Sequence, residues 1–132
     1  MKNKISLLIS GKLGFNLLNV LYNYNDIEFV ATDKSSQEII DFVTSKNIPL
    51  FIGNPRKGKL SDFIGNIKSE LLLSINYLFL VENDLINKFK FPINFHGSLL
   101  PKYRGRTPHV WAIINNETET GVTAHFIDSE CD

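Results

Sequence analysis

The sequence of 132 residues contains a single cysteine, Cys131, so the chain cannot close an internal disulfide. Small secreted scaffolds that depend on disulfides are therefore excluded. A secretory signal is also lacking, because the opening Met-Lys-Asn-Lys leads into an apolar stretch shorter than a signal-peptide core. We expect a cytoplasmic protein.

Excess charge and long apolar runs are absent as well. Fourteen basic and fourteen acidic residues give a formal net charge of zero, which disfavours nucleic acid as a partner. The longest apolar-rich stretch, residues 71–81, is interrupted by Ser74 and Asn76, whereas a membrane helix needs roughly 20 apolar residues. We expect a soluble chain without membrane association, and a length of 132 residues favours one domain without a second.

Segments of β-like residues alternate with segments of helical periodicity along the whole chain, which is typical of a parallel sheet wrapped by helices. The strands are expected at 4–9, 27–32, 49–52, 71–75, 92–96 and 121–128. Helices are expected after the turn at 10–14, at 35–46, around 60–67, at 84–89 and at 107–115. Ser35 followed by Glu38 predicts a capping box at the second helix. The unbroken apolar run of 4–9 predicts a central strand covered on both faces.

The strand at 92–96 carries two polar side chains of catalytic type, Asn94 and His96. Side chains two apart in a strand face the same way, so the amide and the imidazole should project together while Phe95 points to the opposite, buried face. Gly97 and Ser98 follow at once, which places the pair at the carboxyl end of the strand, where doubly wound sheets bind ligands.

Residues 94–101 read NFHGSLLP, Arg104, Gly105 and Pro108 follow, and TGVT at 120–123 precedes Asp132. In order and spacing this pattern resembles the signature of the folate-dependent formyltransferases, which include methionyl-tRNA formyltransferase, phosphoribosylglycinamide formyltransferase and the sugar N-formyltransferases. The earlier part of the chain agrees with the family only in layout. The segment RGRTPHVWA at 104–112 is most similar to enzymes that formylate amino sugars carried on a nucleotide.

The resemblance implies a Rossmann-like, doubly wound, mostly parallel α/β sheet and a catalytic triad of Asn94, His96 and Asp132. It also implies 10-formyltetrahydrofolate as the donor and a primary amine as the acceptor. The chemistry is consistent, because attack on a formyl carbon creates an oxyanion that amide and imidazole N–H groups stabilise. Asp132 would orient His96 and help to take the proton of the amine, directly or through water. No metal is required.

The resemblance further implies which residues surround the donor. The pterin ring would lie against the loop after the preceding strand, at Phe79, Leu80 and Val81. A segment containing Ile127 and Ser129 would close the other side of the pocket.

Acceptor contacts are expected at two places. The turn at Gly11 and Lys12 lies near the acceptor phosphate in formyltransferases, as helix N-terminal N–H groups allow. Arg104 and Arg106 are either solvated loop cations or contacts to a diphosphate. His109 either touches the substrate or lies on the surface.

Several alternatives accompany this interpretation. Asp128 also follows the last strand and rivals Asp132 for the acidic role. The turn from Gly11 to Gly14, with Asp33 downstream, hints at a dinucleotide site, but the G-x-G-x-x-G fingerprint is incomplete. The three histidines match no compact zinc-ligand spacing and have no cysteine pair beside them.

We therefore expect residues 1–132 to be the catalytic, N-terminal domain of a formyltransferase that acts on a nucleotide-linked amino sugar. Methionyl-tRNA formyltransferase is the alternative of the same class, and a non-catalytic remnant that binds folate or a partner is the alternative of another class. Small molecules are the expected partners, and a homodimer is left open. Because the chain stops at Asp132, we expect an incomplete domain, truncated at its C-terminal end, with less activity than a longer form.

Overall fold

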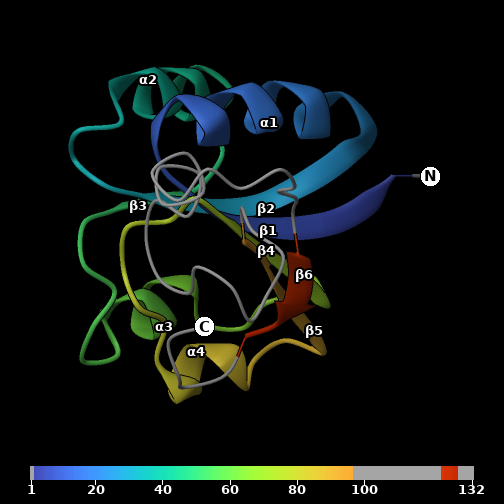
Figure 1. Cartoon of the computed structure of the whole chain (residues 1–132), viewed down its shortest axis with the longest axis vertical. Helices are drawn as coiled ribbons and strands as arrows, with labels where there is room; N and C mark the ends of the chain where they lie inside the picture. Colours follow the sequence, from blue (N-terminus) through green and yellow to red (C-terminus); the bar gives the residue numbers. More distant parts are fainter. Residues whose placement is uncertain (1, 97–122, 128–132) are drawn as a thin grey trace, which may run out of the picture.

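The computed structural model describes residues 2–96 and 123–127 of the chain. They form a six-stranded sheet in the order β3-β2-β1-β4-β5-β6 (Figure 1). The strands are β1 (Asn3–Ile9), β2 (Asn25–Thr32), β3 (Leu50–Ile52), β4 (Leu71–Ile75), β5 (Phe91–His96) and β6 (Thr123–Phe126). The helices between them are α1 (Gly11–Tyr24), α2 (Gln37–Ser45), α3 (Lys59–Ile64) and α4 (Asn83–Ile86). The mostly parallel, doubly wound α/β fold predicted from the sequence is confirmed.

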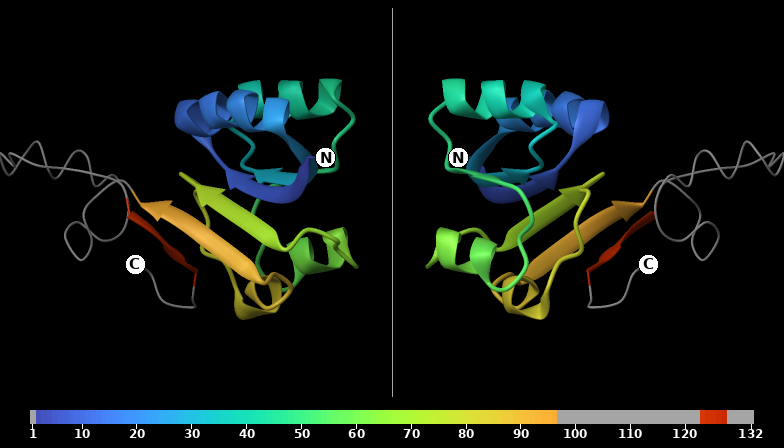
Figure 2. Two further views of the ribbon diagram at one scale, coloured as in Figure 1. Left: turned by 90° about the vertical axis from the view of Figure 1, so that its right-hand side faces the viewer. Right: turned by 90° about the vertical axis from the view of Figure 1, so that its left-hand side faces the viewer.

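The four helices lie on both faces of the sheet. Figure 2 shows α1 and α2 over one face and α3 and α4 over the other. The strand β1 pairs with β2 on one side and β4 on the other, all parallel. The chain therefore turns to opposite faces on the two sides of β1, and the switch point of the sheet falls between β1 and β4.

The unbroken apolar run of β1 is explained by its central place. Ile5, Leu7 and Ile9 belong to the core under α1 and α2, whereas Leu8 belongs to the core beside α3 and α4. All four side chains are at most 1% exposed. Alternate side chains of one strand thus fill two separate cores, as expected of a strand buried on both faces.

Close packing between α1 and β1 depends on Gly14. This glycine is buried in the first turns of α1, and a Cβ built on it would lie only 3.0 Å from Cβ of Ile9. The absence of a side chain therefore allows the helix to lie directly on the central strand. This is one of the uses of glycine in the first crossover of such sheets.

The start of α2 corrects one expectation from the sequence. The N-cap residue is Ser36 rather than Ser35, and no side chain caps the helix. The predicted capping box with Glu38 is therefore wrong. The Ser36 hydroxyl instead donates to Asp33 Oδ1 at 2.6 Å, so the N-cap side chain bonds to the residue three positions before it rather than to the helix backbone.

The edge of the sheet corrects another expectation. The strand β6 runs antiparallel to β5, and Phe95 on β5 lies opposite Ala124. Phe95 is 38% exposed, so its predicted burial is wrong for the part of the chain that the structure describes. The reason is that α1 and α2 pack mainly on β1, β2 and β3 rather than on this edge. The helix expected at 107–115 lies outside the described residues, and α4 is shorter than expected.

Candidate functional site

Polar side chains lie in register where the carboxyl ends of β4 and β5 meet the antiparallel strand β6. Ser74 on β4 is the partner of Asn94 on β5, and Asn94 is the partner of His125 on β6. One step further along, His96 lies opposite Thr123. These positions share the sheet face of α3 and α4, because buried Pro92 pairs there with the core residue Leu72. A band of hydroxyl, amide and imidazole groups therefore crosses the edge of the sheet at which β4 and β5 end.

Asn94 and His96 lie on the same face of β5, as their spacing predicts. His96 is 5% exposed, and Asn94 is half-buried. A polar side chain this close to the core must have hydrogen-bond partners, since an unpaired buried polar group costs about 1–3 kcal/mol. The structure thus holds both groups in an environment with little water, where electrostatic interactions are stronger than in bulk solvent. Asp132 and its rival Asp128 lie outside the described residues.

Sequence reasoning missed the partner of Asn94, which is His125. Nδ2 of Asn94 lies 3.3 Å from Nε2 of His125, and Nδ1 of His125 lies 3.0 Å from the carbonyl oxygen of Phe126. Only an Nδ1–H imidazole satisfies both contacts, donating to the carbonyl and accepting from the amide. In the sequence, only the alternation of polar Thr123 and His125 with apolar neighbours indicated a site residue here. A long connection separates the two strands, so their pairing could not be predicted.

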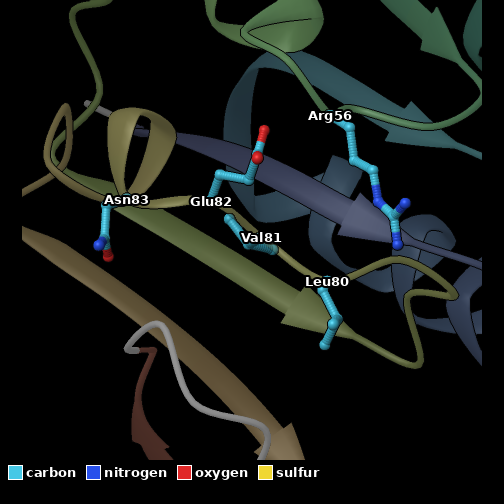
Figure 3. Close-up of a pocket in the computed structure, with 5 residues that line it drawn as sticks. All are labelled: Arg56, Leu80, Val81, Glu82 and Asn83. Carbon is cyan, nitrogen blue, oxygen red and sulfur yellow. The ribbon is translucent and has the colours of Figure 1, made fainter.

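The segment between β4 and α4 forms one wall of a cavity of about 330 Å³. The lining residues include Leu80 and Val81, two of the three predicted donor contacts, together with Arg56, Glu82 and Asn83. The Arg56 side chain extends from the loop before α3 toward the stretch that carries Leu80 (Figure 3). The third predicted contact, Phe79, is half-buried beside this cavity. The cavity thus combines two apolar side chains with one cation, one carboxylate and one amide.

Two contacts shape this wall, one hydrogen bond and one ring contact. Oε1 of Glu82 accepts the backbone N–H of Lys57 at 2.7 Å, which ties the cavity segment to the loop that carries Arg56. The ring of Tyr77 packs edge-on against Phe79 with centroids 5.4 Å apart. Burial, together with the charge of Asp33, raises the pKa of the Tyr77 phenol, so this hydroxyl stays protonated. Among the described residues its Oη has no hydrogen-bond partner.

Ile127 is the only described member of the closing segment predicted beyond the last strand. Its backbone N–H donates to the carbonyl oxygen of Pro92 at 2.8 Å, which extends the pairing of β6 with β5. Its side chain packs against the core beside α3 and α4, as does the side chain of Val81. That Ile127 closes a donor pocket stays a prediction. Ser129 lies outside the described residues.

The turn before α1 carries the remaining predicted acceptor contacts within the described part of the chain. The N–H of Gly11 donates to Oγ of Ser36 at 2.9 Å. Nζ of Lys12 lies 3.4 Å from Oε2 of Glu38, and both side chains are more than half exposed. Such an exposed pair contributes little, so an anionic ligand could compete for Lys12. Arg104, Arg106 and His109 lie outside the described residues.

Asp33 does not serve the dinucleotide role that its position suggested. The side chain is 4% exposed, and its oxygens accept hydrogen bonds from the Ser36 hydroxyl at 2.6 Å and the Ser35 N–H at 3.0 Å. Burial alone would raise the pKa of Asp33, but hydrogen bonds from Ser36, Ser10 and the Ser35 N–H outweigh it and lower the pKa below its ordinary value. The carboxylate that would bind a ribose hydroxyl is therefore used inside the fold.

Two searches of the described residues were negative. No group of three His, Cys, Asp or Glu side chains in residues 2–96 and 123–127 lies close enough to hold a metal ion. In the same part of the chain no helix is long and apolar enough to cross a bilayer.

Comparison with known proteins identifies the class to which this fold and site belong. The sequence profile described as Formyl transferase matches residues 8–132, so the chain belongs to the formyl transferase family. The resemblance carried by residues 94–132 is thereby confirmed.

Among the curated relatives, the bifunctional polymyxin resistance protein ArnA of Wigglesworthia glossinidia brevipalpis is 34% identical over 128 residues, covering 92% of this chain and 18% of that protein. Methionyl-tRNA formyltransferase of Pelotomaculum thermopropionicum is 41% identical over 90 residues, covering 65% of this chain and 28% of that protein. The chain thus spans less than a third of the length of either relative.

Solved structures agree on the fold. The phosphoribosylglycinamide formyltransferase of Bacillus halodurans superposes with a TM-score of 0.82 at 21% identity, covering 98% of this chain and 74% of that one. A 4-N formyltransferase of Francisella tularensis superposes with a TM-score of 0.71 at 27% identity, covering 98% of this chain and 52% of that one.

The buried Asp33 carboxylate generates a stability prediction. Because its folded pKa is lowered, it stabilises the fold above the unfolded pKa of about 3.9 and loses this effect as the pH falls through the folded pKa. Asp33→Asn should lower the free energy of unfolding at pH 7 by about 1–3 kcal/mol, and the difference from wild type should shrink below about pH 4. Urea unfolding across this pH range measures both. Asp41→Asn, at an exposed position on α2, is the matched control, and a pH-independent difference for Asp33→Asn would contradict the prediction.

Proposed function

We propose that this chain carries the catalytic domain of an enzyme that transfers a formyl group from 10-formyltetrahydrofolate to a primary amine. The observation that carries the proposal is the placement of Asn94 and His96 side by side at the carboxyl end of β5 in a member of the formyl transferase family. Residues 1–132 are assigned to this domain. The donor and the amine are small molecules that both need access to this edge of the sheet.

The chemistry requires donors for a developing negative charge. When the amine nitrogen attacks the formyl carbon, the carbonyl oxygen becomes an oxyanion, and the departing folate nitrogen later receives a proton as its bond to that carbon breaks. An asparagine amide carries two N–H donors. Nδ2 of Asn94 lies 3.3 Å from Nε2 of His125, and the proposed contact with the oxyanion is assigned to this amide group. A ring N–H of His96 supplies a second contact, and fixed donors of this kind usually make the largest contribution to acyl transfer.

Proton removal from the attacking amine is assigned to Asp132, directly or through water, with His96 oriented by the same carboxylate. Histidine changes its charge near neutral pH, which suits a group that exchanges protons during turnover. This assignment depends on the family resemblance, because Asp132 lies outside the described residues. Covalent attachment of the formyl group to the enzyme is not needed.

The donor is assigned to the cavity beside Leu80 and Val81. The apolar side chains of Leu80 and Val81 suit the flat pterin ring. Ile127 and Ser129 are assigned to the opposite side. Folate also carries carboxylates, and the guanidinium of Arg56 at this cavity suits them.

The acceptor is proposed to be the amino group of a nucleotide-linked amino sugar. Support comes from the segment at 104–112 and from the 27% identity to a protein named as a 4-N formyltransferase. Gly11 and Lys12 at the start of α1, with Arg104, Arg106 and His109, are assigned to the phosphates and the sugar.

A second candidate acceptor is methionyl-tRNA. The 41% identity over 90 residues to a methionyl-tRNA formyltransferase favours it. The zero net charge of the chain counts against it, because tRNA binding depends on an excess of basic residues.

A panel assay tests the proposed function. The chain is incubated with 10-formyltetrahydrofolate and, in separate reactions, with nucleotide-linked amino sugars, glycinamide ribonucleotide or charged initiator tRNA. We expect donor consumption that depends on a nucleotide-linked amino sugar. Consumption only with tRNA would select the second candidate. Donor binding by calorimetry without turnover on any acceptor would instead support the non-catalytic remnant.

His96 generates a direct prediction. His96→Ala should lower kcat by at least about 100-fold, because loss of one oxyanion donor costs about 100- to 1000-fold in enzymes of this kind. Since His96 is almost fully buried, thermal unfolding must show that the variant is folded. His96→Asn, which keeps an N–H group, serves as a second variant in case alanine disrupts the fold. Full activity in folded His96→Ala would remove His96 from the mechanism, whereas full activity in His96→Asn would show that an N–H donor alone is sufficient at this position.

His125 should act as a positioning residue for Asn94. His125→Phe removes the acceptor from Asn94 Nδ2 and should lower kcat by about tenfold at unchanged KM for the donor, on the scale of one misplaced hydrogen bond. His125→Gln keeps an acceptor and should recover part of the loss. A purely structural role would instead lower the unfolding temperature of both variants at wild-type kcat.

A further inference from the structure

Asn76 is the first residue after β4. Asn76 has a φ of 58°, in the left-handed region that asparagine tolerates better than most residues. This conformation turns the chain away from the sheet and into the segment 77–82, which forms the wall of the cavity beside Leu80 and Val81.

The side chain of Asn76 reaches across to the end of β1. Its Nδ2 donates to the carbonyl oxygen of Ser10 at 3.0 Å. Two residues further on, the backbone N–H of Leu78 donates to Oγ of Ser10 at 3.3 Å. Ser10 is 1% exposed, so both bonds end on a fixed point of the interior rather than on a solvent-exposed group.

Ser10 is also the N-cap residue of α1. Its carbonyl oxygen accepts the N–H of Gly14, which closes the first turn of the helix. A Cβ placed on Gly11 would lie 3.2 Å from Nδ2 of Asn76, so the amide packs directly over the glycine turn. The two connections that leave β1 and β4 are therefore joined through one serine.

We infer that Asn76 is a positioning residue that fixes the donor-cavity segment 77–82 against the turn at Gly11 and Lys12. The inference rests on the proposed function, in which these two segments bind the donor and the acceptor. It goes beyond that function, because it assigns a residue that controls how the two binding segments face each other. Asn76 acts through Ser10, and no contact with either substrate is assigned to it.

The other bonds at this edge complete the connection. The N–H of Gly11 donates to Ser36 Oγ at 2.9 Å, and Ser36 donates to Asp33 at 2.6 Å. The ends of β1, β2 and β4 are thus joined by side chains where their backbone groups no longer pair in the sheet. The Asn76 bond to Ser10 is therefore one of the contacts that hold the 77–82 segment against the start of α1.

Asn76→Gly tests the contribution of the side chain without changing the backbone conformation. Glycine keeps the left-handed turn without strain but removes the amide that holds Ser10. We expect faster hydrogen exchange at the Leu78 N–H, about fivefold weaker binding of 10-formyltetrahydrofolate by calorimetry and a kcat within about twofold of wild type at saturating donor. Asn76→Asp, which keeps the shape but places a carboxylate against the Ser10 carbonyl, should weaken binding at least as much.

Asn47→Gly is the matched control. Asn47 has the same φ of 58° but lies in the exposed turn after α2, away from Ser10. It should change neither Leu78 exchange nor donor affinity. Unchanged Leu78 exchange in Asn76→Gly, or equal weakening of donor binding by Asn47→Gly, would overturn the inference. Absence of donor binding by the wild type would instead count against the proposed function, because the exchange comparison tests the Asn76 contact independently.

Discussion

The divergence of the chain on the two sides of β1 is the constraint on which the rest of the structure depends. After β1 the chain enters α1 on one face, and after β4 it enters the segment leading to α4 on the other face. Backbone groups at the two strand ends lose their sheet partners at this point, and buried ones need substitutes. Ser10 and Asn76 supply those substitutes, so side-chain bonds fix the backbone at the switch point of the sheet.

Residues that sequence alone predicts well are those whose environment is set by simple burial. The strand at 71–75 and the central position of β1 follow from apolar runs that only a two-sided sheet can bury. Asn94 and His96 follow from strand alternation, which is local geometry. The family follows from the order of motifs in residues 94–132 rather than from any physical property of the first part of the chain.

Contacts between distant segments are what the sequence could not supply. Ser35 was expected to cap α2. Instead, the hydroxyl of the next residue, Ser36, donates to Asp33 and accepts the N–H of Gly11. Phe95 was expected in a core because it is aromatic and alternates with polar residues, yet the described helices on its face cover other strands. His125 meets Asn94 only through antiparallel pairing across a long connection. Gly11 and Ser36, like Asn94 and His125, are far apart in sequence, and propensity contains no information about such contacts.

Asp33 illustrates how one topology serves different ligands. In a dinucleotide-binding sheet an acidic residue after the second strand accepts the ribose hydroxyls, which requires an exposed carboxylate. Here the carboxylate accepts hydrogen bonds from the Ser35 N–H and the Ser36 hydroxyl, and it organises the start of α2 instead. The polar groups proposed for catalysis lie on the other side of the switch point. They are Asn94 and His96 on β5 and His125 on β6. Because burial decides whether a charge is offered to a ligand or kept by the fold, position in the topology alone does not assign function.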